Sequence, residues 1–171
     1  IPNYPVEMTV TRGGGGISAR NRVLNAGFEG GKTGNNPYAP ENWQLHATPS
    51  ANEVDVVTTE KHSGAKSVRI NANTESEGIF QSISFNANTS YTLKFWAKVA
   101  SGTLRAEWRV SDAVGNPVIS EMRVIAAANG NVWKEYRMQA TNVGAFGGNL
   151  YLLASGAVDC YVDDVQVLQN T

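Results

Sequence analysis

The sequence is poor in cysteine and histidine. Its 171 residues include one cysteine, Cys160, and two histidines, His46 and His62. A single cysteine excludes an internal disulfide and any zinc site built on several cysteines. The histidines are too far apart for an HExxH motif or a histidine cluster. Cys160 alternates with Val158 and Val162, so we expect it to be a small buried hydrophobic residue.

Charged residues are also few, at 17% of the chain against about 25% in a typical soluble domain. The 14 Lys and Arg nearly balance the 15 Asp and Glu, which gives a net charge of −1. A protein that binds mainly nucleic acid or an anionic membrane usually has a basic excess, so we expect neither partner. No apolar run approaches the roughly 18–20 residues of a membrane span, and no segment has the pattern of a signal peptide.

The abundant residues are those of strands and turns. Val and Thr suit pleated, half-buried surfaces, while the many Asn and the 17 Gly suit turns. Helix-forming residues are scarce. The composition therefore predicts an all-β protein, and its low charge is typical of secreted or cell-surface bacterial β-proteins. The length suits one domain with its own hydrophobic core.

The first residues differ from the rest of the chain. Val6, Met8 and Val10 alternate with polar residues, and four glycines follow at positions 13–16. A run of glycines has high backbone entropy and no side chains to bury, which indicates a flexible joint. We expect residues 1–19 to be an arm or linker and residues 20–171 to be the folded module. The alternative is that the arm adds an edge strand.

Short segments of period-two alternation, separated by turn residues, fill the remainder. They span residues 21–28, 43–47, 54–59, 67–72, 79–85, 91–99, 104–110, 118–125, 133–140, 149–154 and 159–168. Period two on many strands means that one face of each is buried and the other faces water. The sequence therefore predicts a β-sandwich or barrel of antiparallel strands. The expected core comprises Phe28, Val68, Ile70, Ile83, Phe85, Tyr91, Leu93, Phe95, Ala106, Trp108, Val110, Tyr136, Met138, Leu152, Cys160 and Val162.

The last strand shifts its phase at Asp163 and Asp164. Residues 158, 160 and 162 are apolar in one phase, and residues 165 and 167 are apolar in the other. A β-bulge at the two aspartates would restore the inward face and turn an acidic side chain out of register. Two interpretations remain open, namely solvated aspartates at a bulge or ligands for a cation.

Six segments occur in a recognisable order. They read LNAGFE (24–29), NW (42–43), HSGAKSVRI (62–70), YTLKFWAKV (91–99), WKEY (133–136) and YVDDVQV (161–167). Together they resemble the motifs of carbohydrate-binding modules of families 4, 9, 16 and 22. Each motif is short, but six in the same order over residues 21–169 form a specific pattern.

The resemblance implies a β-sandwich jelly roll of two antiparallel sheets. It also implies a non-catalytic module that binds polysaccharide or oligosaccharide chains in a groove on one concave sheet, next to an appended glycoside hydrolase or polysaccharide lyase. It further implies a structural calcium ion. Mapped onto this chain, the calcium ligands are Glu29 and Asp163, with Asp164 as the alternate acid and backbone oxygens around Gly64 to Lys66. We expect a secreted or cell-surface monomer.

A catalytic site is not expected. A glycosidase needs two carboxylates that face each other across the substrate. The sequence has acidic pairs at positions 75/77, 53/55, 107/121 and 163/164. We expect the acids at 75 and 77 to be solvated in a polar loop, and those at 163 and 164 to point away from each other. Ser63 beside His62 is a sequence neighbour and not a triad. The alternative to a binding module is a structural or adhesive jelly roll, such as a spacer of a cell-surface or phage protein.

The expected glycan-binding face lies on the strands at 91–99, 104–110 and 133–140. Its outward residues are Lys94, Trp96, Lys98, Arg105, Glu107, Arg109, Glu135, Arg137 and Gln139. Residues 91–140 contain seven Lys or Arg and four Asp or Glu, so this segment is net +3. Clustered arginines can pair with uronate or pyruvate carboxylates, so both acidic and neutral polysaccharides remain open. The other interpretations are a merely solvated face, or a site on the loops around Trp43 and Phe80.

Overall fold

The computed structural model describes residues 20–34, 37–47, 49–50, 53–84, 86, 89–111, 117–142 and 147–170. The expected arm at residues 1–19 lies outside this set, as do Phe85 and the side chain of Val110. The described elements are all strands: β1 (Lys32–Thr33), β2 (Ala39–Pro40), β3 (Gln44–His46), β4 (Val54–Val57), β5 (Ser67–Ala72), β6 (Gly78–Ile83), β7 (Thr89–Ser111), β8 (Pro117–Ala127), β9 (Trp133–Asn142) and β10 (Gly147–Gln169). Within these ranges, no helix has the length and apolar character needed to cross a membrane.

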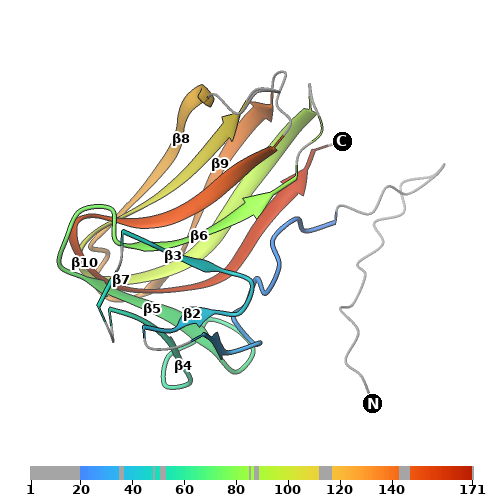
Figure 1. Ribbon diagram of the computed structural model, residues 1–171. Helices are drawn as coiled ribbons and strands as arrows, with labels where there is room; N and C mark the ends of the chain where they lie inside the picture. The colour runs from blue at the N-terminus through green and yellow to red at the C-terminus, as the bar shows by residue number, and fades with distance from the viewer. Residues whose placement is uncertain are drawn as a thin grey trace, which may run out of the picture.

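Two long strands, β7 and β10, pair with each other and run through both layers of the molecule (Figure 1). One layer, here called the β3–β8 layer, has the order β3, β6, β10 (147–154), β7 (103–111), β8. The other, here called the β4–β9 layer, has the order β4, β5, β10 (158–169), β7 (89–99), β9. The described strands pair antiparallel and form two layers, so the predicted sandwich is confirmed.

The two long strands change layers at Gly102 of β7 and at residues 154–158 of β10. The register between the strands shifts at Ala154/Val158, which is where the chain bends. Gly102 has a φ of +73°, and a Cβ placed there would lie 2.0 Å from the carbonyl oxygen of Ala157. Only glycine tolerates both conditions, so this residue allows the two strands to turn together.

The predicted core is largely confirmed. Trp108, Tyr91 and Phe95 are fully buried between the layers, as are the predicted aliphatic positions on β5, β7 and β10. Tyr136 and Met138 are partly buried and pack against this cluster. Cys160 is also fully buried, and burial raises the pKa of its thiol.

The expectation of a strand at residues 21–28 is wrong. Only Asn21 forms a bridge there, to Leu168 of β10. Asn25 and Phe28 have positive φ angles, which an extended strand does not permit. The apolar side chains of this segment reach the core from a turn instead. The expected bulge, in contrast, is confirmed: the β7–β10 register shifts between Asp163 and Gln166, and Asp164 has a φ of +49°.

The assignment of three outward-facing strands to one sheet is also wrong. Residues 91–99 and 133–140 pair in the β4–β9 layer, whereas residues 104–110 lie in the β3–β8 layer. The side chains expected on one face are therefore divided between opposite faces of the sandwich. Periodicity distinguishes the inward from the outward side of a strand, but it does not show which layer the strand joins.

Candidate functional site

Three aromatic side chains lie together on the outer face of the β3–β8 layer. The cross-strand register places Phe80 of β6 opposite Tyr151 of β10, and His46 lies on the adjacent β3. The Phe80 and Tyr151 rings stack with centroids 5.4 Å apart and planes at 25°. His46 meets both rings edge-on, at 6.0 Å from Phe80 and 5.3 Å from Tyr151. The inward neighbours on β6, Ile79 and Ile83, are buried, so these rings belong to the outer side.

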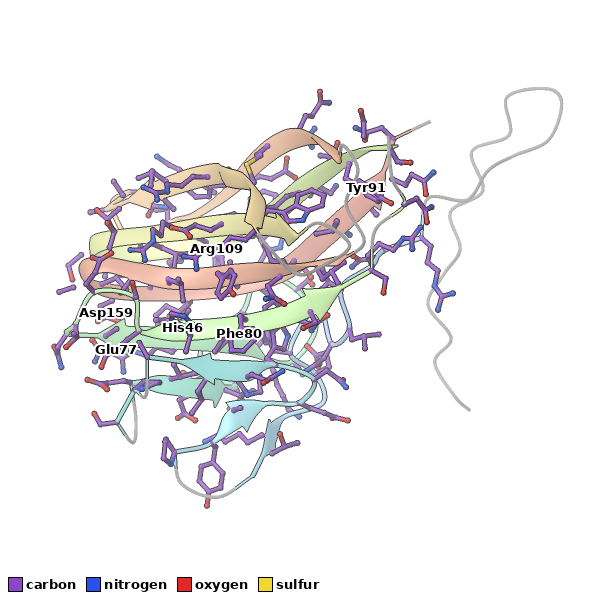
Figure 2. The ribbon with its side chains drawn as sticks, turned by 45° about the horizontal axis from the view of Figure 1, so that its top comes forward. His46, Glu77, Phe80, Tyr91, Arg109 and Asp159 are labelled. Carbon is purple, nitrogen blue, oxygen red and sulfur yellow. The ribbon has the colours of Figure 1, made fainter. Side chains whose placement is uncertain are left out.

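Arginine continues this row on β7. The guanidinium carbon of Arg109 lies 4.4 Å from the centroid of the Tyr151 ring. Tyr151 is therefore covered by Phe80 from the β6 side and by Arg109 from the β7 side. Figure 2 shows Phe80 and His46 side by side, with Arg109 above them. The side chain of Asn149, also on β10, donates to the Tyr151 hydroxyl at 3.1 Å and accepts from Ser82 at 2.9 Å.

Glu107 lies beneath this row with three arginines around it. Its side chain is only 2% exposed. Arg105 Nε donates to Oε1 at 2.5 Å, and Arg109 Nη2 donates to Oε2 at 2.6 Å. Arg123 Nη2 of β8 lies 3.2 Å from Oε1. Burial alone would raise the pKa of Glu107, but the hydrogen bonds from Arg109 and Arg105 outweigh it and hold that pKa below its usual value.

Arg105 is anchored on several sides. In addition to Glu107, it donates to the Ala154 carbonyl at 2.9 Å, to Ser76 Oγ at 2.6 Å and to Glu75. Its side chain is 7% exposed. Arg105 therefore holds Glu107 and the 74–77 loop in place, while Arg109 and Arg123 extend toward solvent with side chains 43% and 40% exposed. We name His46, Phe80, Tyr151, Arg109 and Arg123 the aromatic–arginine face.

The carboxylates in this network do not have the raised pKa of a general acid. A general acid needs a carboxyl group with a raised pKa. The pKa values of Glu107 and Glu75 are both lowered, the first by its arginines against burial and the second chiefly by the Gly156 N–H. Neither carboxylate can hold a proton at neutral pH.

Four of the residues predicted to bind ligand are brought together by the structure: Phe80, Arg105, Glu107 and Arg109. Trp43 is not a surface residue, since it is 3% exposed and stacks on Phe28 in the core. His46, Tyr151 and Arg123 were not among the predicted ligand residues. Tyr151 occupies the outward phase of a strand whose inward Leu152 was predicted correctly, so its phase alone could have identified it.

Three other predicted ligand residues lie on the opposite side of the sandwich. Trp96, Arg137 and Gln139 project from the β4–β9 layer. Trp96 is covered by the 62–66 turn, because the His62 ring stacks on it with centroids 3.9 Å apart and planes at 12°. Arg137 pairs with Glu135 at 2.7 Å. These residues do not join the aromatic–arginine face.

The residues predicted to bind calcium meet where the 62–66 turn packs against Glu29 and the bulge of β10. Glu29 accepts from the backbone N–H of Ala65 at 2.9 Å and of Lys66 at 3.0 Å. Lys66 Nζ donates to the Glu29 carbonyl at 2.8 Å. A Cβ placed at Gly64 would lie within 2.4 Å of a Glu29 carboxylate oxygen, so this turn and the glutamate are in close contact.

Asp163 and Asp164 contact the same turn. Asp163 is fully buried and accepts from the backbone N–H groups of His62, Ser63 and Asp164 at 2.8–3.0 Å. Burial, with the neighbouring Asp164 charge adding to it, raises the pKa of Asp163 to about 6. Asp164 pairs with His62 Nδ1 at 2.6 Å and accepts from Ser63 Oγ at 2.7 Å. Across the described ranges, no three His, Cys, Asp or Glu side chains are close enough to form a metal site by themselves.

Comparison with known proteins decides the family. The model of a family described as "Carbohydrate binding domain" matches residues 20–156. The chain belongs to this carbohydrate-binding family. The match includes every residue of the aromatic–arginine face and begins where the expected module begins. No curated protein matches the sequence significantly.

Solved structures of carbohydrate-binding modules share the fold, and the predicted jelly-roll class is confirmed. The CBM22-1 xylan-binding domain of Paenibacillus barcinonensis Xyn10C is 18% identical, with a TM-score of 0.66 over 84% of this chain and 91% of that one. TmCBM61, solved with β-1,4-galactotriose, is 22% identical, with a TM-score of 0.61 over 88% and 99%. The enzymatically active domain of bacteriophage CBA120 tailspike protein 4 is 18% identical, with a TM-score of 0.70 over 88% of this chain but 21% of that one.

Proposed function

We propose that the aromatic–arginine face binds a polysaccharide chain. The observation that supports this proposal is the concentration of aromatic, guanidinium and amide side chains on one outer face of a carbohydrate-binding module. Aromatic rings offer apolar surface to the C–H groups of sugars, and Arg, Asn and Tyr form directed hydrogen bonds with hydroxyl groups. The family and its neighbours support glycan binding, and the location of the site is our inference.

The binding residues come from rigid strands and not from loops. Phe80, Tyr151 and Arg109 lie on adjacent strands whose inward residues are buried. Their positions are therefore fixed before a ligand arrives, which reduces the entropy lost on binding. This preorganisation is what a module needs in order to hold a repeating polymer with a modest number of contacts.

The test is affinity electrophoresis against a panel of neutral and acidic polysaccharides. We expect Tyr151→Ala to weaken binding of a retarded polymer at least about fivefold, because the ring holds Phe80 and the Arg109 guanidinium in place and aromatic contacts contribute on the order of 1 kcal/mol. Tyr161→Ala is the matched control. Tyr161 lies on the same strand but on the other layer, also beside an arginine, with Arg69 5.8 Å from its ring. Equal effects of the two changes would place the site elsewhere.

We further propose that the module is non-catalytic, is secreted or presented at the cell surface, and directs an appended carbohydrate-active enzyme to its polymer. The membership of a carbohydrate-binding family and the lowered pKa values of the acids on the face support a binding role. A second candidate is a structural or adhesive module, because the same fold forms one fifth of a phage tailspike chain. A complete lack of retardation by every polymer of the panel would favour this second candidate.

A calcium ion is proposed for the site formed by Glu29, Asp163, Asp164 and the 64–66 turn. The three carboxylates fit the ion in kind, since calcium takes oxygen ligands, whereas the backbone groups by which the 62–66 turn contacts Glu29 and Asp163 are N–H groups. Asp163 is buried and no Lys or Arg of the described chain pairs with it, so a cation would compensate its charge. The ion would tie the first turn of the module to its last strand.

Calcium should act through stability, because an ion that binds only the folded chain stabilises it by mass action. At 100 times the dissociation constant the gain is about 2.7 kcal/mol. After treatment with a chelator, the Tm should rise as calcium is added, and Asp163→Asn should remove this response. Asp159→Asn is the control, since Asp159 lies on the same strand but pairs with Arg69 at 3.1 Å. A wild-type Tm that does not move would refute the site.

A further inference from the structure

We infer that His46 supplies the aromatic–arginine face with a hydrogen-bond acceptor, and that its Nε2 atom takes the proton of a sugar hydroxyl group. This inference rests on the proposed glycan-binding function of the same face and names one residue that determines its selectivity. Three observations support it, namely the anchor of the imidazole ring, the occupied oxygens of Glu107, and the donors on the neighbouring strands.

The imidazole ring of His46 is anchored through one of its two nitrogens. Nδ1 lies 2.7 Å from the backbone carbonyl oxygen of Ser76. A carbonyl oxygen can only accept a hydrogen bond, so Nδ1 must carry the proton. In the neutral imidazole Nε2 is then an acceptor. The ring is half-buried, and Nε2 bonds to no residue that the structure describes.

The strand pairing explains the position of the ring. His46 ends β3 in the outward phase, and the preceding Leu45 packs against the core. The cross-strand neighbour of His46 is Gly78, which has no side chain. The imidazole can therefore reach the Ser76 carbonyl beyond it. Because the two nitrogens of an imidazole point in diverging directions, Nε2 is directed away from this carbonyl and is left for a ligand.

Glu107 cannot serve as the acceptor for a sugar on this face. Its Oε1 accepts from Arg105 and lies 3.2 Å from Nη2 of Arg123. Its Oε2 accepts from both Nε and Nη2 of Arg109. With a side chain only 2% exposed, this carboxylate offers no lone pair that a sugar hydroxyl could reach.

The neighbouring strands present donors. Asn149 donates to the Tyr151 hydroxyl at 3.1 Å, and its own carbonyl oxygen accepts from Ser82 at 2.9 Å. The Tyr151 hydroxyl receives this hydrogen bond and keeps its proton to donate, while the guanidinium of Arg109 has donors only. Each sugar hydroxyl both donates and accepts. A ligand that accepts from β7 and β10 can therefore donate to His46 on β3, which completes the hydrogen bonds of its hydroxyl groups.

This role of His46 has a consequence for the effect of pH. Protonation of a neutral imidazole places a hydrogen on Nε2 and converts it from an acceptor into a donor. Histidine is the side chain that ordinarily changes its charge between about pH 5 and 8. Glycan affinity should therefore be highest when His46 is neutral and should fall as the pH is lowered.

The other titratable groups on this side of the sandwich do not produce the same change. Strand β6, next to β3, has no titratable side chain. Glu75 and Glu77 of the 74–77 loop, Tyr151 of β10 and Arg109 of β7 are carboxylates, a phenol and a guanidinium, which ordinarily titrate outside this range. Burial raises the pKa of Asp163 to about 6, but Asp163 lies on the opposite layer and is present in every variant compared.

The experiment compares two variants that both lack Nε2. His46→Phe keeps an aromatic ring but cannot bond to Ser76. His46→Asn loses the ring, but its amide N–H can still donate to the Ser76 carbonyl. The probes are soluble xylan, β-1,4-galactan, hydroxyethylcellulose and polygalacturonate, whose charges stay constant over the range studied. Affinity is measured by calorimetry at about pH 8 and about pH 5, the limits within which histidine ordinarily titrates.

At the higher pH we expect each variant to bind about fivefold more weakly than wild type, because one hydrogen bond contributes a factor of this order. Wild type should lose a similar factor on acidification, and both variants should lack this pH dependence. His62→Phe is the matched control. His62 is the other histidine of the chain and is also bonded through Nδ1, but it lies on the opposite layer against Trp96. Its replacement should leave both affinity and pH dependence within about twofold of wild type.

Each result has a distinct meaning. Wild-type affinity that does not change with pH, variants that bind as well as wild type at the higher pH, or a pH dependence that persists in either variant overturns the role of His46 and leaves the proposed function intact. Absence of wild-type binding to all four polymers overturns the proposed function as well. Thermal unfolding at both pH values identifies a variant that is not folded, and the other variant, which retains different contacts, then decides.

Discussion

Replacing Glu107 by Gln should destabilise the fold more than any surface change on the same strand. The substitution preserves shape but removes the charge that three arginines share. Arg109 and Arg123 reach water and will be solvated, so the main cost arises at Arg105, which is buried. Breaking a buried ion pair typically costs 3–5 kcal/mol. Arg105 keeps Glu75 as an ion partner and the Ala154 carbonyl and Ser76 as acceptors, so we expect the lower end of that range, about 3 kcal/mol.

The assay is urea and thermal unfolding at neutral pH. In a chain of this length, about 3 kcal/mol corresponds to a fall in Tm of roughly 6–12 °C. Glu135→Gln is the control, because Glu135 pairs with an arginine at the same spacing on an exposed face. Such an exposed pair contributes less than about 1 kcal/mol. The double variant Arg105→Met, Glu107→Gln should lose less than the sum of the two single changes, because it removes both charges of the buried pair together.

The pH dependence provides a second measurement. Because the folded-state pKa of Glu107 is lowered, its contribution is complete above the ordinary value of 4.5 and is lost as the pH falls through the folded value. The stability difference between wild type and Glu107→Gln should therefore shrink on acidification below pH 4.5. If Glu107→Gln unfolds within about 1 kcal/mol of wild type at pH 7, the network is solvated and our account of it is refuted.

Three further results are expected. Gly102→Ala should destabilise the module by at least about 2 kcal/mol in urea unfolding, because its Cβ would collide with the Ala157 carbonyl oxygen; a neutral change would refute the need for glycine at the bend. The Cys160 thiol, buried and with a raised pKa, should react with a thiol reagent only after denaturation, and rapid reaction of the native protein would contradict its burial. A chain beginning at Ile17 should keep the Tm and glycan affinity of the longer one, whereas an insoluble product would show that residues 1–16 form a strand of the fold.

The sequence predicted most of the secondary structure because apolar and polar residues alternate along a strand that has one face buried and the other in water. Strand β5 coincides with the predicted range of 67–72, and the two phases of residues 158–167 located the bulge at Asp163 and Asp164. The segment at residues 91–110 shows the limit. It was expected to be two strands because its apolar phase changes between Val99 and Leu104, yet it is one strand that changes layers at a glycine.

The candidate site could be predicted only in part. Arg105, Glu107 and Arg109 were identified from their outward phase, and the structure adds the reason for their proximity, which is a shared ion network. Tyr151 and His46 lie 42 and 63 residues from Arg109 along the chain (151 − 109 and 109 − 46), and only long-range pairing brings them together. Trp96 is an aromatic residue of the kind that can bind a sugar, but His62 covers it. This histidine belongs to the 62–66 turn, and the local sequence pattern does not show where that turn packs.

The central position of β10 has a consequence for synthesis of the protein. This strand is the last of the described elements, yet it hydrogen-bonds to β5 in one layer, to β6 in the other and to β7 in both. Until residues 147–169 have left the ribosome, each of those three strands lacks the neighbour to which it hydrogen-bonds. Because β10 belongs to both layers, neither layer can complete its strand pairing before the other. The nascent module must therefore remain open, with unpaired strand edges that chaperones can bind, and then fold in one cooperative step after its final strand emerges.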